Sequence, residues 1–152
     1  MLAIDPGIHN LGFAVLDDAG SIVDWRLVDL VRKKKPTIAE LVIGAVTFVQ
    51  ELECDRAVVR IEQQPVNNTQ MKVLSHVLQG LFLAKHCHVA LVNPKTYKLS
   101  GGSYTQRKKD AVRRVTEIVH ADTRWGPVFH TSTKKDDLAD ALLLAMWPDG
   151  AE

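Results

Sequence analysis

Short apolar runs separated by turn residues occupy the first part of the chain. Residues 2–5, 12–16 and 21–27 have the length and apolar content of strands, and the turn sequences Asp-Pro-Gly and Asp-Asp-Ala-Gly lie between them. Together they predict an antiparallel meander. Two later runs, 57–61 and 89–92, are rich in β-branched and apolar residues and predict buried strands.

Longer segments with an apolar face separate the later strands. The sequence Thr-Ile-Ala-Glu at 37–40 has the capping-box pattern, which predicts a helix from there to about residue 53. A second helix is expected from residue 68 or 69 to about residue 86. A third is expected after a cap at Ser103 or Thr105, with apolar residues along one face.

The end of the sequence predicts a last helix from residue 136 or 137 to about residue 147. Residues 121–135 before it have no clear period and are expected to be irregular. The resulting order is βββαβαβαα. It predicts an α/β fold with a five-stranded mixed sheet and helices on both faces, formed by one domain spanning residues 1–152.

Composition places the chain among ordinary globular proteins. Of its 152 residues, 46% are hydrophobic and 24% charged, and the net charge of +1 does not by itself indicate a nucleic-acid partner. Cys54 and Cys87 have no metal-binding spacing and are expected to be free thiols. We expect a soluble intracellular protein, with no signal peptide and no segment long enough to cross a membrane.

Four carboxylates stand where a folded catalytic site would place them. Asp5 ends the first predicted strand, Glu62 ends the fourth, and Asp137 and Asp140 share one face of the last helix. Ligand sites form outside strand ends where the topology changes. Mg²⁺ prefers oxygen ligands, and two such ions can stabilise both the attacking and the leaving oxygen in phosphodiester hydrolysis.

Each of these acids also has a structural interpretation. Asp5 before Pro-Gly is a common turn former, and Glu62 can be solvated at a strand end. Asp136 is expected to be the N-cap of the last helix, with Asp137 as a first-turn acid. Asp140 is harder to explain, because it lies in an apolar run where a buried carboxylate needs a partner. The four together favour a metal site.

Three motifs of the chain match a known enzyme family in its own order. Ala-Ile-Asp-Pro-Gly at 3–7, with Asn-Leu-Gly-Phe-Ala-Val at 10–15, resembles the opening strand pair of RuvC-type Holliday junction resolvases. Arg-Ile-Glu-Gln-Gln-Pro at 60–65, with Asn-Thr-Gln-Met-Lys at 68–72, is similar to the second motif of the poxvirus and fungal mitochondrial resolvases. Lys-Lys-Asp-Asp-Leu-Ala-Asp-Ala at 134–141 resembles the final motif of both groups.

The resemblance implies an RNase H-like fold and a homodimer that makes paired symmetric nicks in a four-way DNA junction. It implies two Mg²⁺ ions per site, with Mn²⁺ as a possible substitute. By motif position, the metal ligands and catalytic residues are Asp5, Glu62, Asp137 and Asp140.

Basic residues cluster in the segment from 93 to 114, beside the predicted carboxylate site. Lysines that neutralise phosphates release counterions and strengthen DNA binding. A solvated helix face is the alternative. The resemblance places functional lysines at positions matching Lys98, Lys108 and Lys109. Further predicted DNA contacts are Gln63, Gln64, Lys134 and Lys135, although the two glutamines can equally satisfy loop backbone groups.

The second helix has an apolar sector that is wider than one buried stripe requires. Either the helix is sandwiched within the domain, or it packs against a symmetry mate. The resemblance implies that this helix forms part of the dimer interface. The residues predicted to lie there are Leu74, Val77, Leu78 and Leu81.

Three other functions fit parts of the pattern. An RNase H-like nuclease acting on an RNA–DNA hybrid or another branched substrate would use the same fold and metals, but it needs only one site. An actin-like phosphotransfer lobe also opens with Asp-x-Gly and a meander, yet it normally needs two lobes. A catalytically silent branched-DNA binder would have no need of four intact acids.

Overall fold

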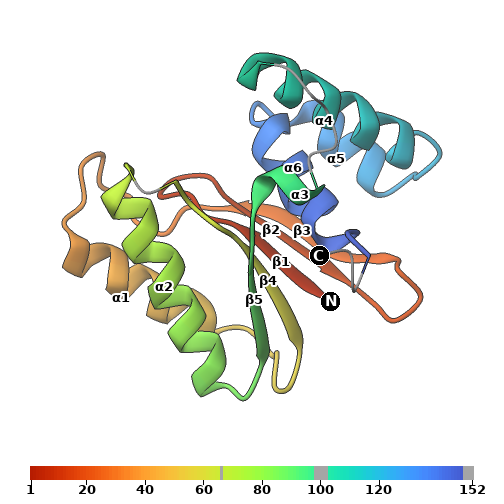
Figure 1. Ribbon diagram of the computed structural model, residues 1–152. Helices are drawn as coiled ribbons and strands as arrows, with labels where there is room; N and C mark the ends of the chain where they lie inside the picture. The colour runs from red at the N-terminus through yellow and green to blue at the C-terminus, as the bar shows by residue number, and fades with distance from the viewer. Residues whose placement is uncertain (66, 98–102, 149–152) are drawn as a thin grey trace.

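Five strands form one mixed sheet in the computed structural model, which describes residues 1–65, 67–97 and 103–148 (Figure 1). The strands β1 (Leu2–Asp5), β2 (Leu11–Leu16) and β3 (Ile22–Val28) are antiparallel neighbours, and β4 (Val58–Glu62) and β5 (His88–Val92) continue in parallel with β1. The strand order is β3-β2-β1-β4-β5, and the five-stranded mixed sheet predicted from the sequence is confirmed. Lys98 lies outside the described residues.

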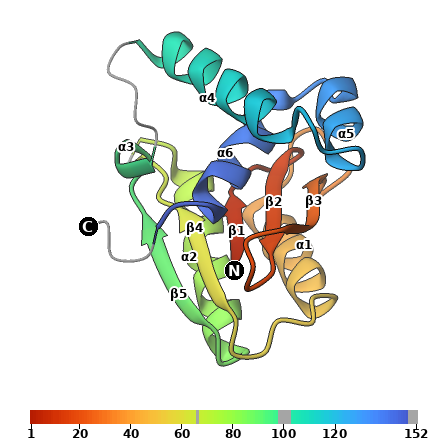
Figure 2. The same cartoon turned by 90° about the vertical axis from the view of Figure 1, so that its right-hand side faces the viewer.

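Helices cover both faces of this sheet (Figures 1 and 2). The helices α1 (Ile38–Gln50) and α2 (Thr69–Ala84) lie on one face, and α6 (Lys135–Ala145) lies on the other, against β1 and β2. The helices α4 (Tyr104–Val119) and α5 (Trp125–Thr131) pack on α6, and the short α3 (Pro94–Tyr97) follows β5. Among the described residues, no helix has the length and apolar character needed to cross a membrane.

Small residues let α6 approach the sheet closely. A Cβ atom built on Gly12 would lie only 2.4 Å from the backbone oxygen of Asp137, so no larger residue fits there without movement. Ala3 on β1 and Ala14 on β2 lie on the same face of the sheet as Gly12, and both are completely buried under the helix. The first turn of α6 is therefore held directly above the ends of β1 and β2.

Most predicted helix boundaries are confirmed. Thr37 and Glu40 form the capping box at the start of α1, and Ser103 caps α4 through a hydrogen bond from the Gln106 amide. The expectation of an irregular segment at 121–135 is wrong, because α5 forms there. Its Phe129 ring stacks on Trp25, a contact between residues far apart in the sequence.

Candidate active site

Three carboxylates converge at one edge of the sheet. Asp5 and Glu62 end the parallel neighbours β1 and β4, and Asp140 approaches them from α6. One carboxylate oxygen from each residue lies within 4.8 Å of those of the other two. Glu62 and Asp140 are 8% and 3% exposed, whereas Asp5 is partly exposed and leaves the cluster open on one side.

The sheet register accounts for this convergence. Ile4 pairs with Ile61 in the parallel ladder, so the next residue of each strand reaches the same edge with its side chain on the same face. That face is covered by α6, whose Asp140 lies one turn after its N-terminal residues. Two adjacent strands and one closely docked helix are therefore enough to assemble the cluster.

The cluster has the chemistry of a divalent cation site. Three carboxylates held this close repel one another, and burial leaves little water to screen their charges. Mg²⁺ and similar hard cations take oxygen ligands and remove this repulsion. Asp5, Glu62 and Asp140 are thus the residues best placed to hold a metal ion.

Tyr97 is a site residue that sequence reasoning missed. Its hydroxyl donates a hydrogen bond to Glu62 Oε2, and its side chain is buried. Burial, together with the negative charges of Glu62, Asp5 and Asp140, raises the pKa of the phenol well above its ordinary value. Tyr97 therefore stays protonated and acts as a donor. Because β5 runs parallel to β4, the residues that follow β5 fall beside Glu62, and this is the signal that could have found Tyr97.

Asp137, the fourth predicted ligand, does not belong to the close cluster of described carboxylates. Its Oδ1 atom lies 3.7 Å from the ammonium group of Lys108. Burial and the adjacent negative charge of Asp136 raise the pKa of the Asp137 carboxyl. Asp137 and Asp5 both line a cavity of about 340 Å³. Its role as a ligand stays a prediction.

Lys108 bridges α4 and the start of α6 through a hydrogen-bonded ion pair with Asp136. Burial alone would lower the pKa of Lys108, but its hydrogen-bonding and charge interactions with Asp136 and Tyr104 together outweigh burial and raise the pKa. The prediction of Asp136 as an N-cap is wrong, because α6 begins at Lys135 with Lys134 in the cap position. Asp136 lies in the first turn and pairs with the neighbouring helix instead.

A cavity of about 640 Å³ adjoins Glu62 and Asp140. The predicted DNA contacts Gln63, Gln64 and Lys108 line it, and so do the cationic side chains of Lys95 and Arg107, which lie in the basic segment. The exposed ring of Tyr104 also borders it, with the Lys108 ammonium group 5.3 Å from the ring centroid. The structure thus gathers cations, amides and one aromatic ring beside the carboxylates.

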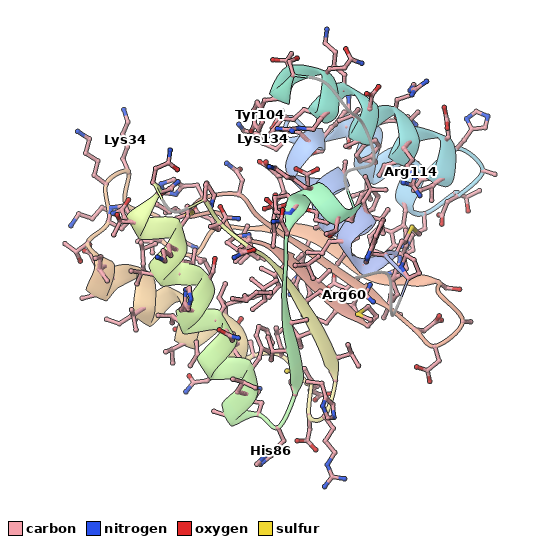
Figure 3. All side chains as sticks on the ribbon, viewed as in Figure 1. Lys34, Arg60, His86, Tyr104, Arg114 and Lys134 are labelled. Atoms are coloured by element: carbon pink, nitrogen blue, oxygen red, sulfur yellow. The ribbon has the colours of Figure 1, made fainter. Side chains whose placement is uncertain are left out.

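The other predicted DNA contacts within the described residues do not line this cavity. Lys109 is exposed and borders a shallow hollow that Lys108 and Tyr104 also line. Lys134 is exposed and Lys135 half-buried at the N-terminus of α6; Figure 3 labels Lys134 there. The positive charge of Lys134 contributes to the lowered pKa of Asp136 and offsets part of the rise in the pKa of Asp137, which places it within electrostatic range of both carboxyls.

Two of the four predicted interface residues on α2 are not available at the surface. Leu74 and Leu78 are buried in the core shared with α1 and the sheet, so their assignment to a dimer interface is wrong. Of the two interpretations of the wide apolar sector, the sandwiched helix holds for these residues. Val77 and Leu81 are partly exposed, and their place in an interface stays a prediction.

Comparison with known proteins decides the family. The sequence family described as Poxvirus A22 protein matches residues 1–148. The chain belongs to this family. The resemblance to poxvirus resolvases found in the sequence motifs is thereby confirmed. No curated protein sequence matches the chain significantly.

Solved structures share the fold of this A22-family protein. The fowlpox virus resolvase, solved with substrate Holliday junction DNA, matches with a TM-score of 0.69 and 22% identity over 96% of this chain and 95% of that chain. RuvC of T. thermophilus in complex with a Holliday junction substrate matches with a TM-score of 0.62 and 16% identity, over 96% and 90%. The predicted RNase H-like fold of RuvC type is confirmed.

Proposed function

We propose that this protein is a Holliday junction resolvase, a metal-dependent endodeoxyribonuclease that makes paired symmetric nicks in four-way DNA junctions as a homodimer. The observation that carries the proposal is the cluster of Asp5, Glu62 and Asp140. It lies at the sheet edge of a chain whose family is that of the Poxvirus A22 protein. A similar fold is found in a fowlpox virus resolvase solved with junction DNA.

We propose that the close carboxylate cluster, with Asp137 as the fourth ligand, holds two Mg²⁺ ions, or Mn²⁺ in their place; the oxygen-only donors of Asp5, Glu62 and Asp140 support this. Bound divalent ions supply a nucleophilic hydroxide at neutral pH and neutralise charge on the phosphate oxygens. Tyr97 holds Glu62 in orientation through its hydrogen bond. Lys108, Gln63 and Gln64 face the cavity beside the carboxylates and bind the DNA backbone near the cut.

A homodimer suits a substrate with two-fold symmetry, since two identical sites can then cut two strands. The partly exposed Val77 and Leu81 are the residues of α2 that a partner copy would cover. The substitution Val77→Asp should separate the protomers and uncouple the paired nicks, whereas the exposed His76→Asp on the same helix should not. Sedimentation together with nick mapping measures both effects.

A nicking assay with Mg²⁺ tests the function itself. It compares a labelled four-way junction with a linear duplex and with an RNA–DNA hybrid, and uses Asp5→Asn as the inactive control. Paired symmetric nicks in the junction, absent in Asp5→Asn, are the expected result. Preferential cleavage of the hybrid, or single unpaired nicks, would assign the carboxylates to a different nuclease of the same fold.

A further inference from the structure

Arg60 is a buried cation in the middle of the sheet. It lies on β4 two residues before Glu62, so both side chains emerge on the face covered by α6. Arg60 is only 5% exposed. Its Nη1 atom donates hydrogen bonds to the carbonyl oxygens of Leu144 at 3.2 Å, Ala145 at 3.4 Å and Trp147.

Leu144 and Ala145 are the last two residues of α6, and Trp147 follows the end of the helix, where Figure 3 labels Arg60. The last four carbonyls of a helix have no partner within the helix, and that end carries a partial negative charge. The helix ends in Ala-Met-Trp at 145–147, without the glycine that forms the common C-terminal cap directly after a helix. The guanidinium group supplies the missing donors and the opposite charge from the neighbouring strand.

The distance from Arg60 to Glu62 along β4 is close to the distance from Leu144 to Asp140 along α6. Two residues of a strand, from Arg60 to Glu62, span about 6.6 Å. Four residues of a helix, from Asp140 to Leu144, rise about 6 Å. Because α6 runs away from the site while β4 runs toward it, a helix held at Leu144 by Arg60 presents Asp140 opposite Glu62.

We infer that Arg60 is a positioning residue for the metal site. It fixes the height of α6 along β4, so that Asp140 meets the carboxylates of Asp5 and Glu62. It acts by holding the end of the helix. The inference rests on the proposed function, since it assigns Arg60 a part in the same site.

Arg60→Met tests this role, because methionine fills much of the space but donates no hydrogen bond. The matched control is Phe48→Leu, a buried change within α1, which packs on the opposite face of the sheet. Thermal unfolding first establishes the stability loss of each variant. Calorimetric titration with Mn²⁺ alone, and cleavage rate as a function of Mg²⁺ concentration, then separate metal affinity from the maximal rate.

Arg60→Met should weaken Mn²⁺ binding by about 10-fold or more, the effect of losing a group that orients metal ligands. The Mg²⁺ concentration for half-maximal cleavage should rise by a similar factor. Arg60→Lys, which keeps the charge and some donors, should recover part of both, and Phe48→Leu should change neither. A merely structural arginine would lower the melting temperature without this selective loss of metal affinity.

The inference would be overturned if Arg60→Met bound Mn²⁺ with unchanged affinity. It would also be overturned if Arg60→Met and Phe48→Leu, compared at equal thermal stability, lost the same Mn²⁺ affinity. If Arg60→Met does not fold, Arg60→Lys decides in its place by the same comparison. The failure of the proposed function looks different, since the wild-type protein would then cut no junction. The calorimetric titration of Mn²⁺ would still report on Arg60 in that case.

Discussion

The two faces of the sheet differ in the side chains that they bury. Under α1 and α2 the core is apolar, and the rings of Phe13 and Phe48 meet edge to face. Under α6 the same sheet buries Arg60, Glu62 and Asp140 among small and apolar side chains. Buried charges cost free energy unless they are paired or bind metal. One face therefore supplies stability, and the other gives up part of it to hold a reactive site.

The largest expected effect is on the charged face. Asp140→Asn should lower junction cleavage by at least about a hundredfold, since even the loss of a group that orients a metal ligand costs up to that factor. In metal-free buffer its melting temperature should equal or exceed that of the wild-type protein, because a charge is removed from a repulsive cluster. Retained cleavage, or a clear loss of stability, would contradict the proposal that the face under α6 holds the reactive carboxylates at a cost in stability.

The apolar face should respond in the opposite way. Leu78→Ala removes a completely buried side chain and should destabilise the protein by about 2–5 kcal/mol, which urea denaturation measures. The folded fraction should bind Mn²⁺ with wild-type affinity. A stability loss that depends on protein concentration would instead return Leu78 to the dimer interface.

A pair of glycine substitutions sharpens the contrast in packing. Gly12→Ala places a methyl group against the α6 backbone and should cost about 1–3 kcal/mol, as overpacking of a core does. Gly80→Ala on the exposed side of α2 meets no atom within 4 Å and should stabilise the helix by up to about 1 kcal/mol. Denaturation curves of both variants test this. Equal changes in the free energy of unfolding would show that the close approach of α6 at Gly12 does not make this position sensitive to an added methyl group.

Lys108 tests whether the charged face also binds DNA. Lys108→Ala should weaken junction binding and reduce the slope of log affinity against log salt by about 0.9, the value for one lost phosphate contact. Asp136→Asn is the matched control, because it removes the charge of the closest ion-pair partner and keeps the lysine. Its slope should be at least that of the wild-type protein. Identical slopes in all three proteins would remove Lys108 from the phosphate contacts.

The smallest effect concerns the capping box of α1. A hydrogen bond from the Thr37 backbone, aided by Lys33, lowers the pKa of Glu40 from 4.5 to about 2. A depressed carboxyl pKa stabilises the fold above the unfolded value, and this stabilisation is lost as the pH falls from about 4.5 toward 2. The stability difference between wild type and Glu40→Gln should shrink over that window in denaturant titrations. A constant difference would show that the ionised carboxylate contributes nothing.

Local patterns predicted the elements of this protein well. The strands, the capping box and the ends of β1 and β4 follow from residues that are close together in the chain. That Asp5 and Glu62 lie close together was predictable because parallel strand ends share one edge. Such features depend on period and turn chemistry, which a single sequence records.

Contacts between distant segments explain the wrong predictions. Residues 121–135 carry no helical period, yet α5 forms because Phe129 and Trp125 pack against Trp25. The wide apolar sector of α2 suggested an interface, but Leu74 and Leu78 are covered by α1 and the sheet. Periodicity shows that a face is buried, and it does not show which partner buries it.

The sequence by itself determined which residues could carry the chemistry: the acids at strand ends, the basic segment and the family motifs. The tertiary structure decided how they are held. It brought the Tyr97 hydroxyl to Glu62, paired Lys108 with Asp136, and placed the Arg60 guanidinium at the end of α6. The physical reason is that these contacts depend on the register between elements, which packing sets across the whole fold and no local pattern encodes.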